Sequence, residues 1–287
     1  MPNMVDERFE LAALIFRLAG HEEFGFRDTD YQRETERFFI KFENHEAIKY
    51  TRTLQFGYDA VFKFSVHITK DDGIFIFIDD ILSLFDGRWN HENAERFLAL
   101  FNEFYVDTDY GSFFDSHTEY FEQCTQRFID EIYGRIDFGW FAKYVDTSNL
   151  RCIYSPSSDN FGATVNGRII YCLVYDRGSS VIHEFCHSFA NPIADRWYAE
   201  NPEFRMWCDD SINSEKMPYY DAGWIMAREY VTRAYNILYE VQHGASLEEW
   251  LSKEKDFRFK NSFKYINEVY GMIIAGKFQK DGNMTHG

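Results

Sequence analysis

One five-residue pattern constrains this chain more than any other feature: His183 and His187 enclose Glu184 in the order His-Glu-x-x-His. On a helix, residues four apart lie one above the other on the same face, so both imidazole rings can reach a single cation. Glu184 then lies beside that cation, where its carboxylate can accept a proton from water. The pattern therefore predicts a helix here. The apolar face of that helix consists of Val181, Ile182, Phe185 and Phe189.

The two histidines have an alternative interpretation, a hydrogen-bonded pair on a core helix. Coincidence is a poor explanation, because a chain of 287 residues with 9 His yields roughly 0.02 chance matches to the pattern. The metal that this pattern holds in helical sites is Zn²⁺, which takes three protein ligands in catalytic sites and leaves one position for water. We therefore predict a zinc site.

The third ligand has to come from another part of the chain. Metzincin metallopeptidases place a glycine and a further histidine after the pattern, whereas this chain has Ala190 and Ile193 there. Glu229 is the preferred candidate, because it interrupts a mostly apolar helical stretch and Arg233, one turn later, can orient its carboxylate. An ordinary salt bridge between these two residues is the alternative. The competing carboxylates are Glu215, Asp221 and Glu240.

The segment before the pattern predicts a small sheet. Residues 151–154 have the character of a short strand, and two apolar runs, 163–165 and 168–175, flank Asn166-Gly167. Asn-Gly between apolar runs is the strongest short-range signal of a hairpin. The second run is long enough to be a central strand or one near an edge. We hypothesise that it offers its edge to an extended peptide by strand addition.

Two long helices follow the hairpin. The helix with the His-Glu-x-x-His pattern is expected to run to Asn191 and to stop before Pro192, because proline disfavours a helical residue before it. The second helix should span about Asp221 to His243, with Asp221 as its N-cap and Gly244 at its end. Its apolar stripe consists of Trp224, Ile225, Val231, Leu238 and Val241.

The first 145 residues are expected to be mainly helical. Apolar residues recur at helical spacing in 31–56, 91–106 and 112–133. Residues 59–85 alternate like a strand at one point, yet a helix is also possible there. The N-terminal stretch is typical of an amphipathic helix rather than a signal peptide. Its apolar face consists of Leu11, Leu14, Ile15 and Leu18.

These patterns together predict the fold class α+β, mainly helical, with a small hairpin sheet before the His-Glu-x-x-His helix. At this length we expect one domain over 1–287. Within it, a helical part would span 1–145 and a metal-binding core 146–287.

The charge of the chain restricts its partners. Lys and Arg total 30 against 47 Asp and Glu, a formal net charge of −17. Such a surface repels phosphate, so neither nucleic acid nor an anionic membrane surface is an expected partner. The apolar runs are far shorter than the ~20 residues of a transmembrane helix. The five cysteines contain no C-x-x-C pair, which argues against a disulfide framework and a cysteine zinc site.

Two stretches carry a resemblance to a known family. The sequence His183–Pro192, HEFCHSFANP, followed by Glu-x-x-x-Arg-Ala at Glu229–Ala234, resembles the zincin-like domain of unknown function 4932. These two motifs are similar more broadly to the gluzincin metallopeptidases. The stretch Glu10–Gly20 also resembles the start of the domain of unknown function 4932. The resemblance implies a zincin-like core over most of the chain, with Glu184 as general base. It implies three zinc ligands: His183, His187 and Glu229.

Further residues near the motifs have candidate roles. Asn191 could hydrogen-bond a ligand or fix the following loop, and the alternative is a helix-ending residue before proline. Arg233 and Asn191 are thus candidate supports of the site. Candidates for stabilising an oxyanion are Tyr219, Tyr220 and Tyr235. Residues expected to be structural are His117, Cys186 and His243.

These features favour zinc-dependent hydrolysis of a peptide or protein substrate. Glu184 would take a proton from metal-activated water and deliver it to the leaving amine. Two alternatives stay open: a non-catalytic binding protein on a zincin scaffold, and a metal-dependent hydrolase of a non-peptide amide. The oligomeric state also stays open, as does the choice between the cytoplasm and export.

Overall fold

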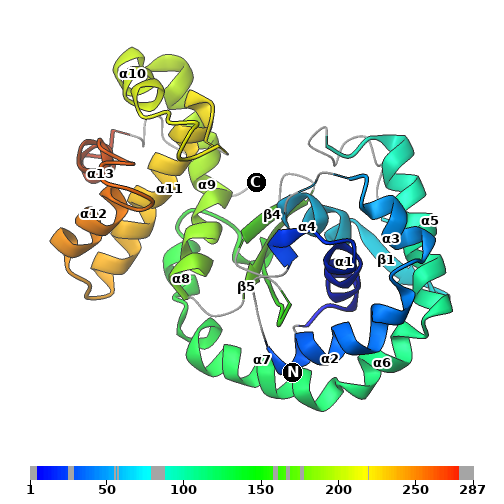
Figure 1. Cartoon of the computed structure of the whole chain (residues 1–287). Coiled ribbons are helices and arrows are strands. Elements are labelled where there is room, and N and C mark those ends of the chain that lie inside the picture. Colours follow the sequence, from blue (N-terminus) through cyan, green and yellow to red (C-terminus); the bar gives the residue numbers. More distant parts are fainter. Residues whose placement is uncertain are drawn as a thin grey trace. The chain divides into compact units, whose positions relative to one another are not determined.

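The computed structural model describes residues 5–24, 29–54, 56, 58–78, 88–157, 161–165, 169–174, 178–218 and 220–277 (Figure 1). It is mainly helical with small sheets, which confirms the class α+β at that level. No helix within these ranges is long and apolar enough to cross a membrane.

The chain divides into two compact units. Unit 1 comprises Met1–Ile136 and Ser148–Val181, and unit 2 comprises Asp137–Thr147 and Ile182–Gly287. This division differs from the expected one at residue 145, because the segment 148–181 with its sheet belongs with the N-terminal helices. The expectation of a single domain stays a prediction.

Unit 1 is built mainly from helices joined by short connections. They are α1 (Glu7–Leu18), α2 (Asp30–Phe39), α3 (Glu46–Thr51), α4 (Tyr58–Val66), α5 (His91–Asp107), α6 (Tyr110–Ser116) and α7 (Thr118–Glu131). A small hairpin, β1 (Ile68–Asp71) and β2 (Ile74–Phe77), lies between α4 and α5 in the sequence. The predicted helix over 91–106 is confirmed, with Phe97, Phe101 and Phe104 buried on one face.

Helix α1 forms the centre of unit 1. It contacts α2, α3 and α4, and in Figure 1 it lies inside the arc of the surrounding helices. Its residues 9–16 are all buried, including the polar Glu10. The prediction of a helix is confirmed, but the prediction of a single apolar face is wrong. A helix surrounded by other helices loses its solvent face, and its sequence then needs apolar residues all round.

Packing settles one ambiguous stretch of unit 1, and one predicted helix is found as two. Residues 58–66 form a helix and not a strand, and Phe62, Phe64 and Val66 are all buried. An apolar run buried on every side has no informative period, so either element fitted it. The predicted helix over 112–133 is divided at His117, whose ring packs against Tyr31 and Phe121 in the aromatic core.

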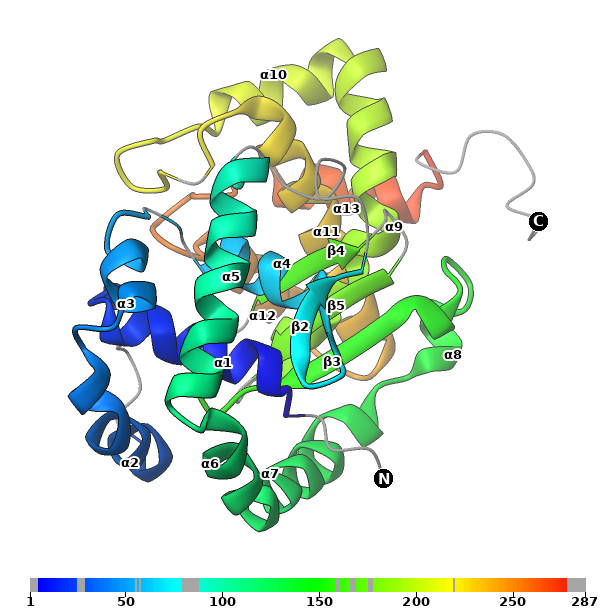
Figure 2. The same ribbon diagram turned by 90° about the vertical axis from the view of Figure 1, so that its right-hand side faces the viewer.

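The sheet of unit 1 has three strands, β3 (Leu150–Tyr154), β4 (Phe161–Val165) and β5 (Ile169–Val174). The order is β3-β5-β4, with β5 parallel to β3 and antiparallel to β4 (Figure 2). The predicted hairpin is confirmed, since Val165 pairs with Ile169. Its Asn166-Gly167 turn lies outside the described residues. The hypothesis that 168–175 offers an edge is wrong, because β5 is hydrogen-bonded on both sides.

Unit 2 is helical throughout its described part. Its helices are α8 (Phe138–Phe141), α9 (Gly178–Glu200, whose first turn belongs to unit 1), α10 (Pro202–Asp210), α11 (Gly223–Gln242), α12 (Leu247–Lys255) and α13 (Ile266–Ile274). Helix α11 contacts α10, α12 and α13. It is buried along most of its length, which makes it the central helix of this unit.

Helix α9 continues past Pro192 to Glu200, so the prediction that it ends at Asn191 is wrong. Proline removes one backbone hydrogen bond from a helix and crowds the preceding turn, but it does not forbid continuation where packing outweighs that loss. Ile193 and Ala194 are buried directly after the proline. They extend the apolar face of the helix by another turn.

The two ends of α11 differ in how well they were predicted. Gly244 has a φ of +96° and ends the helix as expected, with N–H groups of Gly244 and Ala245 donating to the carbonyls of Val241 and Glu240. At the start, the N-cap is Ala222 and not Asp221. Trp224, expected in the apolar stripe, is 46 % exposed. The guanidinium of Arg228 covers its ring at 4.8 Å.

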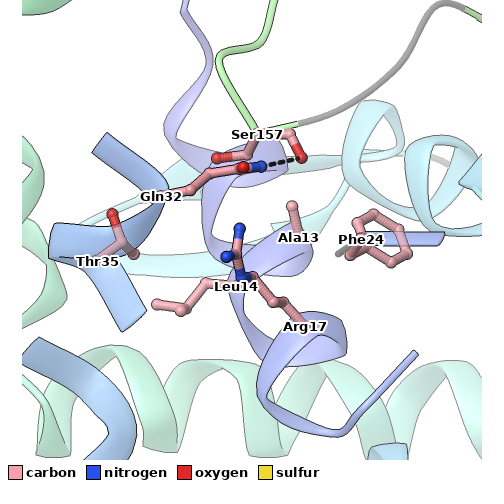
Figure 3. A pocket seen from close by; sticks show the side chains of 7 residues that line it. All are labelled: Ala13, Leu14, Arg17, Phe24, Gln32, Thr35 and Ser157. Atoms are coloured by element: carbon pink, nitrogen blue, oxygen red, sulfur yellow. Dashed lines mark hydrogen bonds between the residues drawn. The ribbon is translucent and has the colours of Figure 1, made fainter. Parts of the chain in front are cut away.

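A small cavity lies in unit 1 between α1 and α2. Its volume of about 10 Å³ matches about one water molecule. Figure 3 shows Arg17 and Gln32 beside it, with the amide of Gln32 donating to the carbonyl of Ser157 at 3.2 Å. Because of its size, this cavity is not a candidate substrate site.

Candidate metal centre

Helix α9 separates an apolar face from a polar one. Pairs of buried residues recur every four positions: Val181 and Ile182, Phe185 and Cys186, Phe189 and Ala190, Ile193 and Ala194. Burial of this stripe sets the rotation of the helix about its axis. The positions between the pairs hold His183, Glu184 and His187, which are half-buried. The predicted apolar face is therefore confirmed, and it leaves both imidazoles on the opposite face.

Glu229 reaches these two histidines from α11. The imidazole nitrogens of His183 and His187 and a carboxylate oxygen of Glu229 all lie within 4.8 Å of one another. This is the one such cluster of potential metal ligands within the part of the chain that the structure describes. The competing carboxylates Glu215 and Asp221 are exposed. Burial raises the pKa of Glu240, and the charges that act against this rise are Lys253 and His243, not the two histidines of α9.

The separations between the three donor groups fit a tetrahedral metal ion. Nε2 of His183 lies 3.2 Å from Nε2 of His187. Oε2 of Glu229 lies 3.6 Å from His183 Nε2, and Oε1 of Glu229 lies 3.5 Å from His187 Nε2. Two donors bound tetrahedrally to one Zn²⁺ at their usual bond lengths lie roughly 3.3 Å apart. The donor set and its spacing thus suit Zn²⁺.

The ring of His187 is oriented by two acceptors. Its Nδ1 lies 2.8 Å from Oδ1 of Asn191 and 3.0 Å from Oγ1 of Thr232. Because an amide oxygen only accepts hydrogen bonds, Nδ1 carries a proton, and Nε2 is the nitrogen that faces Glu229 and would bind a cation in the neutral ring. Metal-binding histidines usually have such a partner on the other ring nitrogen. Asn191 was a candidate from the sequence, whereas Thr232 was missed, since one threonine in a helix carries no signal of its own.

The carboxylate of Glu229 is held by Arg233, as its position one turn later suggested. Nη2 of Arg233 donates to Oε2 of Glu229 at 3.1 Å. Nη1 donates to Oε2 of Glu254 at 2.5 Å. Glu254 lies in the charged run Ser-Lys-Glu-Lys, which is typical of a solvated helix face. Nothing in the sequence indicated that it would join the site.

The charges of the cluster shift one another. Burial raises the pKa of Glu229, but hydrogen bonding to His187 and the charges of Arg233 and His183 outweigh it and hold that pKa well below its usual range. Burial lowers the pKa of His183. It acts in the same direction on His187, but the hydrogen bond and charge of Glu229 raise that pKa to about 9. The carboxylate is therefore ionised, as a metal ligand must be.

Glu184 and Tyr220 are two further titratable groups whose pKa values shift near the cluster. Burial raises the pKa of Glu184 to about 6, which moves this carboxylate toward the range of an effective general base at neutral pH. The charge of Glu229, together with burial, raises the pKa of Tyr220 to about 12. Tyr220 therefore keeps its proton and can donate a hydrogen bond near Glu229.

The other residues singled out from the sequence lie away from the three candidate ligands or outside the described residues. Tyr235 is buried in the core, where its ring packs against Tyr144 and Phe189. Tyr219 lies outside the described residues. Cys186 is buried on the apolar face of α9, where burial raises its thiol pKa. His243 ends α11, with Nδ1 2.7 Å from the carbonyl oxygen of Tyr239, as expected of a structural histidine.

No protein-family model, no curated protein and no solved structure matches this chain.

Proposed function

We propose that this protein is a zinc-dependent hydrolase of peptide bonds. His183, His187 and Glu229 would hold the ion. The observation that carries the proposal is the convergence of two imidazole nitrogens and a carboxylate at 3.2–3.6 Å from one another. This is the spacing of ligands around a tetrahedral ion with a fourth position for water. The resemblance of its two motifs to the gluzincin metallopeptidases supports the same proposal.

In this proposal the protein's own residues bind, orient and move protons. The ion, when bound, polarises the substrate carbonyl and lowers the pKa of a water molecule toward ~7. Glu184 follows His183 directly on the ligand face of α9, and it accepts the proton of that water and passes it to the leaving amine. Asn191 and Thr232 keep His187 in the tautomer that binds through Nε2. Tyr220 donates a hydrogen bond to the oxyanion.

The proposal is tested by separating metal binding from turnover. Purified wild-type protein and Glu184→Gln are loaded with Zn²⁺, analysed for metal content and incubated with a peptide library, with and without a chelator. We expect about one zinc per chain in both proteins. Cleavage should occur in wild type alone, with a loss in Glu184→Gln of at least ~100-fold, because general-base catalysis contributes about that much.

The outcomes distinguish the alternatives. Wild-type protein that binds no zinc would remove the proposal. Zinc binding without cleavage of any peptide would leave a metal-binding scaffold, and a screen of non-peptide amides would then separate a binding protein from a different hydrolase. Undiminished cleavage by Glu184→Gln would overturn the role of Glu184 as base.

A further inference from the structure

Helix α12 is attached to unit 2 through an unusual residue. Of its nine residues, all of which the structure describes, Glu254 is the one that is buried. The side chain of Glu254 is 5 % exposed. A surface helix normally buries apolar side chains, and a glutamate is almost never fully buried unless it is paired. The partner of Glu254 is Arg233 of α11, whose side chain is 4 % exposed.

Arg233 divides its two terminal nitrogens between two carboxylates. Nη1 donates to Glu254 at 2.5 Å and Nη2 donates to Glu229 at 3.1 Å. The rings of Phe257 and Phe263 lie against the guanidinium at 3.8 and 4.4 Å. A guanidinium facing a single carboxylate usually binds both of its oxygens. Here Glu254 takes Nη1 of Arg233, so Glu229 is bound through Nη2 alone.

We propose that Glu254 is a positioning residue of the metal centre: it holds Arg233 on Oε2 of Glu229, so that the carboxylate keeps a fixed orientation and Oε1 faces His187. This role rests on the proposed zinc function. Oε1 of Glu229 accordingly lies 3.5 Å from Nε2 of His187. Oε2 carries the hydrogen bond from Arg233 and lies 3.6 Å from Nε2 of His183. Partners of this kind orient the ligands of metal sites and tune their affinity.

The charges support the same role. Arg233 places a positive charge beside the carboxylate that would bind a divalent cation, and without compensation that charge would repel the ion. Glu254 supplies the compensation at the other terminal nitrogen of Arg233. A buried group of three charges is seldom the most stable way to fill a core, because apolar side chains of similar volume avoid the cost of desolvation. Its presence next to the candidate ligands is therefore better explained by tuning of the site than by stability.

The test compares the zinc affinity of full-length variants. Glu254→Gln keeps the shape of the side chain and removes its charge. The control is Asp195→Asn, because Asp195 forms a two-bond ion pair with Arg228 and so joins α9 to α11, the two helices that carry the candidate ligands. The Kd for Zn²⁺ is measured by competition with a chromophoric chelator, and circular dichroism and the melting temperature report the fold. We expect Kd to rise ~10–100-fold in Glu254→Gln and less than about threefold in the control.

Each outcome has a separate meaning. If wild type binds zinc and folded Glu254→Gln binds it equally well, the positioning role is overturned while the zinc centre stands. If wild type binds no zinc, the proposed function fails and the role fails with it. If Glu254→Gln does not fold, Glu254→Asp decides, because it keeps the charge but withdraws it from Arg233. Its Kd should rise about 3–10-fold, and a wild-type value would overturn the role. A purely structural Glu254 would lower the melting temperature without changing Kd.

Discussion

Two buried glutamates show how neighbours determine the charge of the same side chain. Glu229 lies among Arg233 and two histidines, and its pKa is held well below the usual range. Glu10 is buried in unit 1, where its hydrogen-bond partners are the hydroxyls of Ser155, Ser157 and Tyr31. These neutral donors do not offset desolvation, so the pKa of Glu10 rises to about 7. Glu229 is therefore ionised at neutral pH, whereas Glu10 stays protonated below neutral pH.

Glu10 should therefore make the stability of the fold depend on pH. Its pKa is 4.5 unperturbed and about 7 in the folded chain, so the folded state holds this proton more tightly than the unfolded state. The stabilisation is complete below about pH 4.5 and is lost as pH rises through about 7, a change of about 3 kcal/mol. Urea unfolding at pH 5 and pH 8 should show this fall in wild type and not in Glu10→Gln. Equal pH dependence in both proteins would contradict the assignment.

Glu229 should be required for the metal and for little else. In Glu229→Ala, two imidazoles remain without the third ligand, and Arg233 faces the vacated space with its charge uncompensated on that side. We expect the Kd for Zn²⁺ to rise by more than ~100-fold, beyond the 10–100-fold typical of supporting residues. Elemental analysis after gel filtration measures the loss. Unchanged zinc content would move the ligand role to another carboxylate.

At the scale of single elements, helix ends depend on backbone geometry as much as on side chains. Gly244 and Gly271 make this testable, because a Cβ at either position would meet no atom within 4 Å. Gly244 has a φ of +96°, whereas Gly271 lies inside α13. Gly244→Ala should lower the free energy of unfolding by about 1 kcal/mol, since a left-handed residue disfavours a Cβ.

Gly271→Ala is the matched control for Gly244→Ala. It should raise the free energy of unfolding by about 0.5–1 kcal/mol, because alanine is the better helix former in an ordinary helical position. Urea denaturation of both variants gives the two signs directly. The same sign in both would mean that the left-handed geometry does not end α11.

At the scale of the whole molecule, the candidate site lies within one unit. His183, His187, Glu229, Arg233 and Glu254 all belong to unit 2, although α9 begins in unit 1. A ligand that binds only the folded form stabilises the segments that hold it. The effect of zinc should therefore be local to unit 2.

Hydrogen exchange followed by mass spectrometry measures that localisation. Zinc at about 100 times its Kd stabilises the binding-competent state by about 2.7 kcal/mol. Compared with chelator-treated protein, α9 after residue 182, α11 and α12 should become more protected. Helices α1 and α5 of unit 1 should not change. Equal protection of both units would show that the metal acts on the chain as a whole.

Sequence patterns were reliable where the deciding interactions are local. The spacing of His183 and His187, the hairpin of β4 and β5, and the end of α11 at Gly244 each depend on a few consecutive residues. Helical periodicity and turn preferences act at that range, and they do not depend on what else the chain packs against. The sequence also singled out Glu229, because one charged residue in an apolar helix is conspicuous, and the structure brings its carboxylate to the two histidines.

Packing between distant segments decided the rest. The sequence of α1 could not tell a surface helix from a central one, and only the sheet order placed β5 between two neighbours. Burial of Ile193 and Ala194 carried α9 past Pro192. The sequence around Glu254 is typical of a solvated helix face, but the packing of α12 places Glu254 against Arg233. These outcomes depend on which surfaces meet in three dimensions, and the order of residues along a single segment does not contain that information.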